Sequence, residues 1–311
     1  MTGSAAILTS MTKISRPALL AFVLVFSLIW SSAFIAGKIA VRDVDPILAL
    51  ILRFALSAVI MLPFLAKDWK AWSPRIVKTG LLLGLLNNAA YLGFNFSAFA
   101  YTTPTVVVVI VSCAPFLAIL FSVAAGLERF DPVKTLGVAI GFLGVITIVG
   151  FNVSRNDAIG IALTLCGTAA FAIATVLFRG RAANLPVLPL NFWQSVSGAI
   201  ALLPVFALKD APLVHFTAPA WLAILYLTII VTIGGSALWF MLIRWSGPSS
   251  ASSYHLLNPF CVVILSYLVL GSPIEARAFL GAAIIGAGLL LTTRNSSPAA
   301  SPSLAEAEEG C

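Results

Sequence analysis

The stretch TPTVVVVIVSCAPF, residues 103–116, has a counterpart 144 positions later in GPSSASSYHLLNPF, residues 247–260. Both copies carry proline at their second position and Pro-Phe at their end. The same offset relates Gly144 to Gly288 further along the chain. Upstream, an Xaa-Pro pair recurs at an offset of 140, and one loop can absorb the difference of four residues. The sequence therefore indicates two copies of one unit.

The composition indicates a membrane protein. Of 311 residues, 60% are hydrophobic and 9% are charged, whereas soluble domains carry about 25% charged residues. Ten apolar windows approach the ~20 residues that cross a ~30 Å hydrocarbon layer. We place these spans at 18–38, 46–66, 77–97, 103–125, 132–151, 158–178, 187–207, 219–243, 249–270 and 275–293. The fold class that we expect is an all-α polytopic membrane protein with ten transmembrane helices.

The repeat sets the expected topology. Two copies with five spans each, 18–151 and 158–293, must insert with opposite orientation. Such inverted repeats are typical of secondary transporters, in which two halves move around a site near the midplane. Lys and Arg are concentrated on one side of the predicted topology, which places both termini in the cytoplasm. We expect 1–17 to be a cytoplasmic segment and the Ser/Pro/Ala/Glu-rich tail, 294–311, to be disordered.

Several classes of partner and cofactor are disfavoured. The net charge of +7 follows from the membrane topology, and no basic run with interleaved aromatic residues suggests nucleic-acid binding. The four cysteines are scattered without metal-ligand spacing, so we expect no metal site and no cofactor. The expected partners are a small-molecule substrate and the lipid bilayer, with the protein a monomer or homodimer.

The acidic residues bear on coupling and on catalysis. All eleven fall at span ends, in loops or in the tail, so no carboxylate lies in mid-span to accept a proton or Na⁺. This favours an uncoupled or weakly coupled pathway. Paired intramembrane aspartates and the His-Glu-x-x-His motif are missing, and nothing orients His255 as a base for Ser236. We therefore expect no catalytic residues.

Neutral polar and aromatic residues recur at helical spacing inside the apolar spans. The candidate substrate-binding residues are Trp30, Ser31, Asn87, Tyr91, Asn95, Trp239, Tyr254, His255 and Asn258. An amide that faces lipid leaves its hydrogen-bonding groups unmet, so these stripes should face protein or water. One hypothesis is a central, roughly neutral cavity. The alternative is hydrogen bonding between helices as packing, worth about 0.6 kcal/mol per contact.

A cation and two prolines complete the candidates. Arg53 lies within the second span, where it can hold a substrate carboxylate in bidentate geometry. The alternatives are an ion pair with Asp43 or Asp45, or snorkelling to the headgroups. Pro115 and Pro259 should each bend a helix, either toward a cavity or as a packing accommodation.

Small residues mark the last span of each repeat. Glycines recur along one face at 132–151 and are scattered through 275–293. Such residues let helix backbones approach closely. We expect these spans to act as scaffold and to pack within the chain, with packing against a second protomer as the alternative.

The order of motifs resembles the EamA-type members of the drug/metabolite transporter superfamily. The likeness rests on WSSAF at 30–34, Arg53-Phe54, AFAYTTP at 98–104, and Pro115-Phe116. The second copy departs from the pattern, since Trp193 stands where the first has Arg53. The resemblance implies ten helices in an inverted repeat and export of small metabolites. The aromatic, carboxylate-free interior is most similar to the aromatic amino-acid exporter subgroup.

Taken together, the sequence favours a multi-pass exporter of the bacterial inner membrane. It would move small zwitterions, most of all amino acids including aromatic ones, by alternating access. One alternative is a drug or other metabolite exporter of the same fold, with or without proton coupling. More distant alternatives are a receptor or scaffold, disfavoured by the short loops, and an intramembrane enzyme.

Overall fold

The structure is a computed structural model. It describes residues 16–66, 69–124, 131–149, 155–182, 185–239, 241–242, 254–255, 258–271, 273 and 275–294. Within these ranges the chain is helical, with one isolated antiparallel bridge between Val44 and Val214. Residues 1–15 and 295–311 lie outside the described ranges; of the tail predicted at 294–311, Arg294 is described and ends the last helix.

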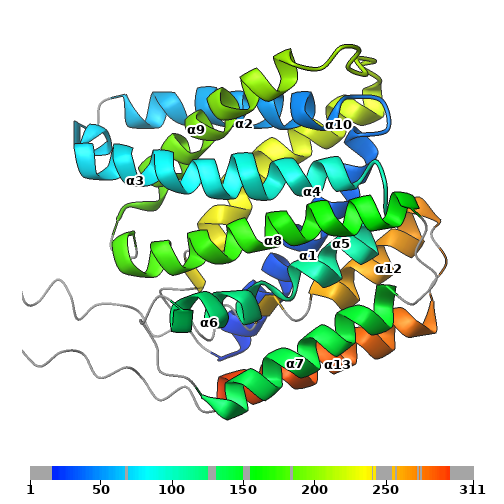
Figure 1. The fold of residues 1–311 in the computed structure, drawn as a ribbon. Coiled ribbons are helices and arrows are strands. Elements are labelled where there is room, and N and C mark those ends of the chain that lie inside the picture. Colours follow the sequence, from blue (N-terminus) through cyan, green and yellow to red (C-terminus); the bar gives the residue numbers. More distant parts are fainter. Residues whose placement is uncertain are drawn as a thin grey trace, which may run out of the picture.

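The helices follow one another in two series (Figure 1). The first series is α1 (Arg16–Ala40), α2 (Pro46–Leu65), η1 (Trp69–Trp72), α3 (Pro74–Gly84), η2 (Leu85–Tyr91), α4 (Leu92–Ala98), α5 (Pro104–Val111), α6 (Ala114–Ala124) and α7 (Pro132–Val149). The second series is α8 (Arg155–Arg181), α9 (Val187–Ala207), α10 (Ala218–Tyr226), η3 (Leu227–Gly235), α12 (Asn258–Leu270) and α13 (Ala276–Arg294). η1 is a 3₁₀ helix, whereas η2 and η3 are π-helices.

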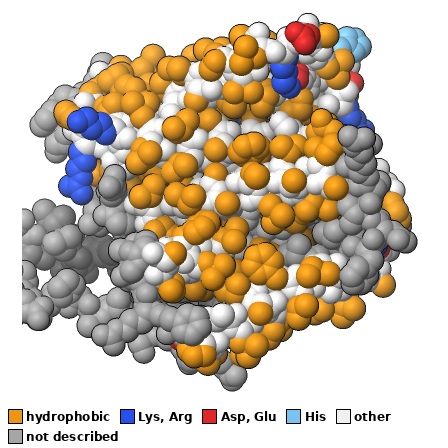
Figure 2. Space-filling view, in the orientation of Figure 1, with side chains coloured by type: hydrophobic (Ala, Val, Ile, Leu, Met, Phe, Trp, Pro, Cys, Tyr) orange, Lys and Arg blue, Asp and Glu red, His pale blue; other side chains and the backbone are white. Residues whose placement is uncertain are grey.

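The helices have the length and composition of membrane spans. Among the described residues, five are long and apolar enough to cross a bilayer: Pro17–Ala40, Pro46–Leu65, Asp157–Phe178, Val187–Ala207 and Ala218–Trp239. Shorter apolar helices are Thr135–Gly144, Cys261–Leu270 and Ala276–Gly288. Figure 2 shows hydrophobic side chains across most of one face, with charged side chains near its edges. The all-helical membrane class is confirmed, while ten spans in inverted halves stay a prediction.

Helices α7 and α13 pack side by side along one edge of the molecule (Figure 1). Their backbones touch at glycines: a Cβ built on Gly144 would lie 2.7 Å from the carbonyl oxygen of Gly281. A Cβ built on Gly288 would lie 2.6 Å from the carbonyl oxygen of Gly137. The expectation that these small residues pack within the chain is therefore confirmed.

Polar caps start several helices. Asp45 caps α2 by accepting from the backbone N–H of Ile47 at 2.8 Å, and Pro46 occupies the first turn. Thr103 caps α5 in the same way, and Thr217 caps α10. In each case a proline follows in the first turn, where its missing N–H would have no partner anyway.

The span expected over 103–125 is interrupted. α5 ends at Val111 and α6 begins at Ala114, with a turn at Ser112 and Cys113 just before Pro115. Proline has no N–H for the backbone bond four residues back, which favours a break at this place. The side chains of Pro115 and Pro259 lie outside the described residues, so a bend toward a cavity stays a prediction.

The two π-helices occupy related positions. η2 covers 85–91, and the same residues shifted by the repeat offset are 229–235, inside η3 at 227–235. Each π-helix continues an α-helix: η2 lies between α3 and α4, and η3 follows α10 directly. π-helical turns are rare and frequently occur at functional sites. Both copies of the unit thus carry the same irregularity.

Candidate functional site

Four ring systems from distant segments form what we call the aromatic cluster: Phe26, Trp30, Trp239 and His255. Trp239 stacks on Phe26 with centroids 5.4 Å apart, and its centroid lies 4.7 Å from that of His255. Trp30 meets His255 edge-on at 5.4 Å. Tyr254 packs against the same cluster. The structure therefore brings together four of the predicted site residues.

Phe26 was not among the predicted residues, although it is fully buried at the centre of the cluster. It precedes Trp30 by four residues, so both side chains lie on one face of α1. That spacing is a sequence signal that could have found it.

A polar edge borders the aromatic cluster. The Asn258 side-chain nitrogen lies 2.9 Å from His255 Nδ1, and the Ser31 hydroxyl donates to the Asn258 carbonyl at 3.3 Å. An amide nitrogen can only donate, so Nδ1 accepts and the ring proton resides on Nε2. His255 Nε2 and Asn258 Oδ1 are buried without hydrogen-bond partners. Such atoms are uncommon in folded proteins and call for an explanation.

A second group, which we call the Arg53 centre, consists of Arg53, Thr232, Phe54 and Phe96. Arg53 is only 5% exposed, and its Nε donates to the Thr232 hydroxyl at 2.7 Å. Its guanidinium carbon lies 5.6 Å and 5.9 Å from the ring centroids of Phe54 and Phe96. No carboxylate among the described residues pairs with it.

This geometry excludes the two alternative roles considered for Arg53, an ion pair with Asp43 or Asp45 and snorkelling to the headgroups. Asp45 pairs with Lys209, and Asp43 accepts from the Thr217 hydroxyl. The expected ion pair with either aspartate is therefore wrong, because both carboxylates are engaged at the end of α2. Snorkelling is also wrong, since the side chain is buried.

Tyr91 packs against α8. It is buried, and its ring centroid lies 4.7 Å from that of Phe171 on α8, with the two rings tilted. Asn95 donates to the Tyr91 carbonyl at 2.7 Å. Its own Oδ1 is buried and has no partner. Tyr91 and Asn95 thus face α8.

Asn87 points elsewhere. Its side-chain nitrogen donates to Gln194 of α9 at 3.3 Å. The residues of the stripe expected from α-helical spacing have different partners, because Asn87 bonds to α9 whereas the Tyr91 ring packs on α8. The structure does not place Asn87 with the aromatic cluster.

The aromatic cluster and the Arg53 centre are joined by one helical segment. Thr232 of the Arg53 centre and Trp239 of the aromatic cluster are separated by seven residues, roughly 10 Å along a helix. Sequence reasoning missed Thr232, although Thr228, Thr232 and Ser236 recur every four residues in this apolar run, a spacing that could have found it.

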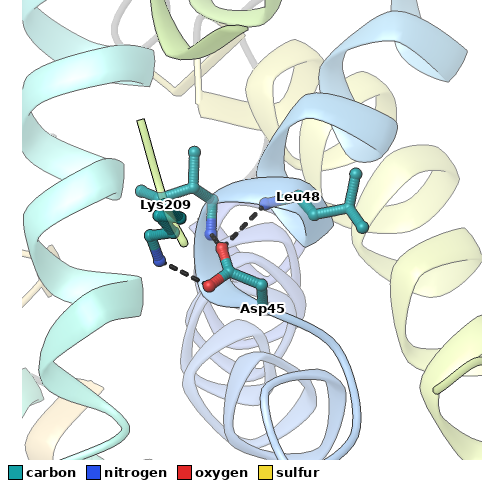
Figure 3. Close-up of polar contacts among 4 residues, drawn as sticks. Asp45, Leu48 and Lys209 are labelled. Atoms are coloured by element: carbon teal, nitrogen blue, oxygen red, sulfur yellow. Dashed lines mark hydrogen bonds and ion pairs between the residues drawn. The ribbon is translucent and has the colours of Figure 1, made fainter. Parts of the chain in front are cut away.

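At one end the two repeats are tied together by what we call the inter-repeat latch, residues 43–45 against 209–217. Val44 bridges Val214, and the Asp45 N–H donates to the Leu213 carbonyl at 2.6 Å. Figure 3 shows the Asp45 carboxylate between the backbone N–H of Leu48 and the Lys209 ammonium. These contacts hold the two repeats together at this end.

An apolar hollow between α6 and α7 lies apart from both groups. It is lined by Ile119, Leu120, Val123, Ala124, Asp131, Thr135 and Val138. None of the predicted site residues lines it, so it offers no support for them.

Comparisons with known proteins settle the family. The profile of the EamA-like transporter family matches this chain twice, over residues 17–150 and 158–294. The chain belongs to the EamA-like transporter family. It is accordingly a membrane transporter built from two EamA repeats. The family resemblance inferred from the motifs is confirmed at this level, and the family's transport role agrees with the expectation of a non-enzymatic protein.

Relatives of this EamA protein come from bacteria and archaea. The uncharacterized transporter YoaV of Bacillus subtilis is 23% identical, over 86% of this chain and 94% of its own. An uncharacterized transporter of Archaeoglobus fulgidus is 28% identical, over 85% and 95%. The uncharacterized inner membrane transporter YedA of Escherichia coli K12 is 26% identical, over 86% and 87%.

A solved crystal structure shares the fold. It superposes with a TM-score of 0.65 at 20% identity, covering 90% of this chain and 98% of the other. At this identity the likeness concerns the fold alone.

Proposed function

We propose that this EamA transporter exports small zwitterionic metabolites, most of all amino acids including aromatic ones. The observation that carries the proposal is Arg53, a buried guanidinium without a carboxylate partner among the described residues. Burying an unpaired charge is costly, and a charge-assisted bond to an anion offsets that cost. A substrate carboxylate supplies the missing anion.

The aromatic cluster suits the other end of such a substrate. Trp30, Trp239 and Tyr254 present ring surfaces that bind aromatic or aliphatic side chains by stacking and by burial of area. His255 Nε2 and Asn258 Oδ1 offer a donor and an acceptor beside these rings. The rings contact one another in this structure, so substrate must part them to enter.

The proposed cycle is alternating access between two inverted five-helix repeats in the bacterial inner membrane, with both termini in the cytoplasm. The inter-repeat latch closes one end and would open in the alternate state. We propose that transport is uncoupled or weakly coupled. Supporting this, the described acidic residues Asp43, Asp45, Asp131, Asp157, Asp210 and Glu275 all lie at helix ends or in loops.

The test is flux into proteoliposomes that contain the full chain, with radiolabelled Trp, Phe, Thr or Met, with and without a pH gradient. We expect uptake above protein-free vesicles that the gradient leaves unchanged. Flux that requires the gradient would contradict the uncoupled mechanism and favour the proton-coupled alternative. Absence of flux for every amino acid would favour a drug or other metabolite as substrate.

A further inference from the structure

The Arg53 centre contains a second residue whose geometry bears on substrate choice. Thr232 lies on η3, 5% exposed, and its hydroxyl has two partners. It is 2.9 Å from the Leu227 carbonyl and 2.7 Å from Arg53 Nε. A carbonyl can only accept and an arginine N–H can only donate. The hydroxyl proton must therefore point to Leu227, and its lone pair to Arg53.

The turn that carries Thr232 is itself held in place. The bond to Leu227 spans five residues, as in the π-helix that contains both. From the opposite side, the Asn191 amide of α9 donates to the Thr232 carbonyl at 2.8 Å. Asn191 is 6% exposed, so water does not compete strongly for this bond. Both the side chain and the backbone of Thr232 are thus fixed.

Arg53 is fixed at its backbone as well. Its carbonyl accepts from the Ser57 hydroxyl at 2.8 Å and lies 3.4 Å from the Thr228 hydroxyl. Thr228 and Thr232 are one turn apart on η3, so this π-helix contacts both the backbone carbonyl and the side-chain Nε of Arg53. The guanidinium itself is held through Nε.

We propose that Thr232, supported by Asn191, is a positioning residue that selects a planar carboxylate. A carboxylate can meet arginine side-on, through Nε and one terminal nitrogen, or end-on, through the two terminal nitrogens. Thr232 occupies Nε, so the end-on pair remains for substrate. This inference rests on the proposed function, and it specifies the ligand as a single carboxylate bound end-on.

The second repeat does not reproduce this arrangement. At the repeat offsets, Trp193 corresponds to Arg53 and Asn88 to Thr232. The Trp193 indole donates instead to the Ala71 carbonyl at 3.1 Å, which ties α9 to η1. The positioned guanidinium therefore belongs to one half only, and each chain should bind one carboxylate at this place.

The experiment is competition against L-phenylalanine flux in proteoliposomes with two analogues. One analogue, 3-phenylpropionate, keeps the carboxylate, and the other, phenethylamine, lacks it. In Thr232→Val we expect KM for L-phenylalanine and the inhibition constant of 3-phenylpropionate to rise about tenfold, the usual effect of losing one hydrogen bond to a charged group. Inhibition by phenethylamine should not change. Thr232→Ser keeps the hydroxyl and should behave as the unaltered protein.

Controls separate this role from a structural one. Thr164→Val removes a buried hydroxyl that bonds only within α8, to Gly160 at 2.7 Å, and should leave both inhibition constants unchanged. If Thr232→Val does not fold, Thr232→Ala removes the same hydroxyl with less bulk. Equal weakening of both analogues, or of neither, would overturn the inference while leaving the proposed function intact. No flux of L-phenylalanine by the unaltered protein would overturn both.

Discussion

Replacing Gly288 with alanine tests the contact between α7 and α13. The added Cβ would lie 2.6 Å from the Gly137 carbonyl oxygen and 2.8 Å from the Gly141 nitrogen, whereas ordinary contact begins at 3.4 Å. Both neighbours are backbone atoms, which cannot rotate away as a side chain can. The two helices would have to separate by about 0.8 Å, with loss of the close packing on which helix association in lipid depends.

The matched control is Gly286→Ala in the same helix. A Cβ at Gly286 meets nothing within 4 Å. Both substitutions gain about 1 kcal/mol of helix propensity, so that contribution cancels when the variants are compared. The remaining difference is the cost of overpacking, about 1–3 kcal/mol. Gly286→Ala should be neutral or stabilising, and Gly288→Ala should be less stable than it.

The assay is thermal unfolding of the purified protein in one detergent at one scan rate, because unfolding of such proteins is often irreversible. We expect the Gly288→Ala transition to lie at least about 2 °C below that of Gly286→Ala. Coincident transitions, or a higher one for Gly288→Ala, would show that these helices do not pack as described.

Further predictions concern the latch and the aromatic cluster. Asp45→Asn keeps an acceptor that caps α2 but loses the ion pair with Lys209, so unfolding should show a loss of about 0.5–1 kcal/mol. Asp45→Ala also loses the cap and should cost about 1 kcal/mol more; equal losses would argue against the cap. A cysteine pair at Asp43 and Thr217, whose side chains bond directly, should block flux when oxidised and release it when reduced. Unchanged flux after oxidation would show that this end does not open. Tyr254→Ala should weaken transport in a graded way, and complete loss with normal binding would favour chemistry at that residue.

The fold class could be predicted from the sequence, because a bilayer constrains each membrane span separately. Each span must satisfy its own backbone bonds and present apolar side chains, so composition and length reveal it. The repeat was equally accessible, and the small residues of the last span in each half predicted close packing that the contact between Gly144 and Gly281 confirms. The EamA family followed from the same motifs.

Part of the candidate site was accessible as well. Trp30, Trp239 and His255 were singled out as polar or aromatic residues within apolar runs, and the structure gathers them into one cluster. Their contact with substrate stays a prediction.

Only the tertiary structure decided which groups are partners. Arg53 contacts Thr232 across 179 positions, and Asp45 contacts Lys209 across 164, so no local pattern could pair them. Asn87 likewise donates to Gln194 of α9 across 107 positions. Periodicity reports which face of a helix a residue occupies when the helix is regular. Which helix lies opposite that face, and where regularity fails, depends on packing between distant segments.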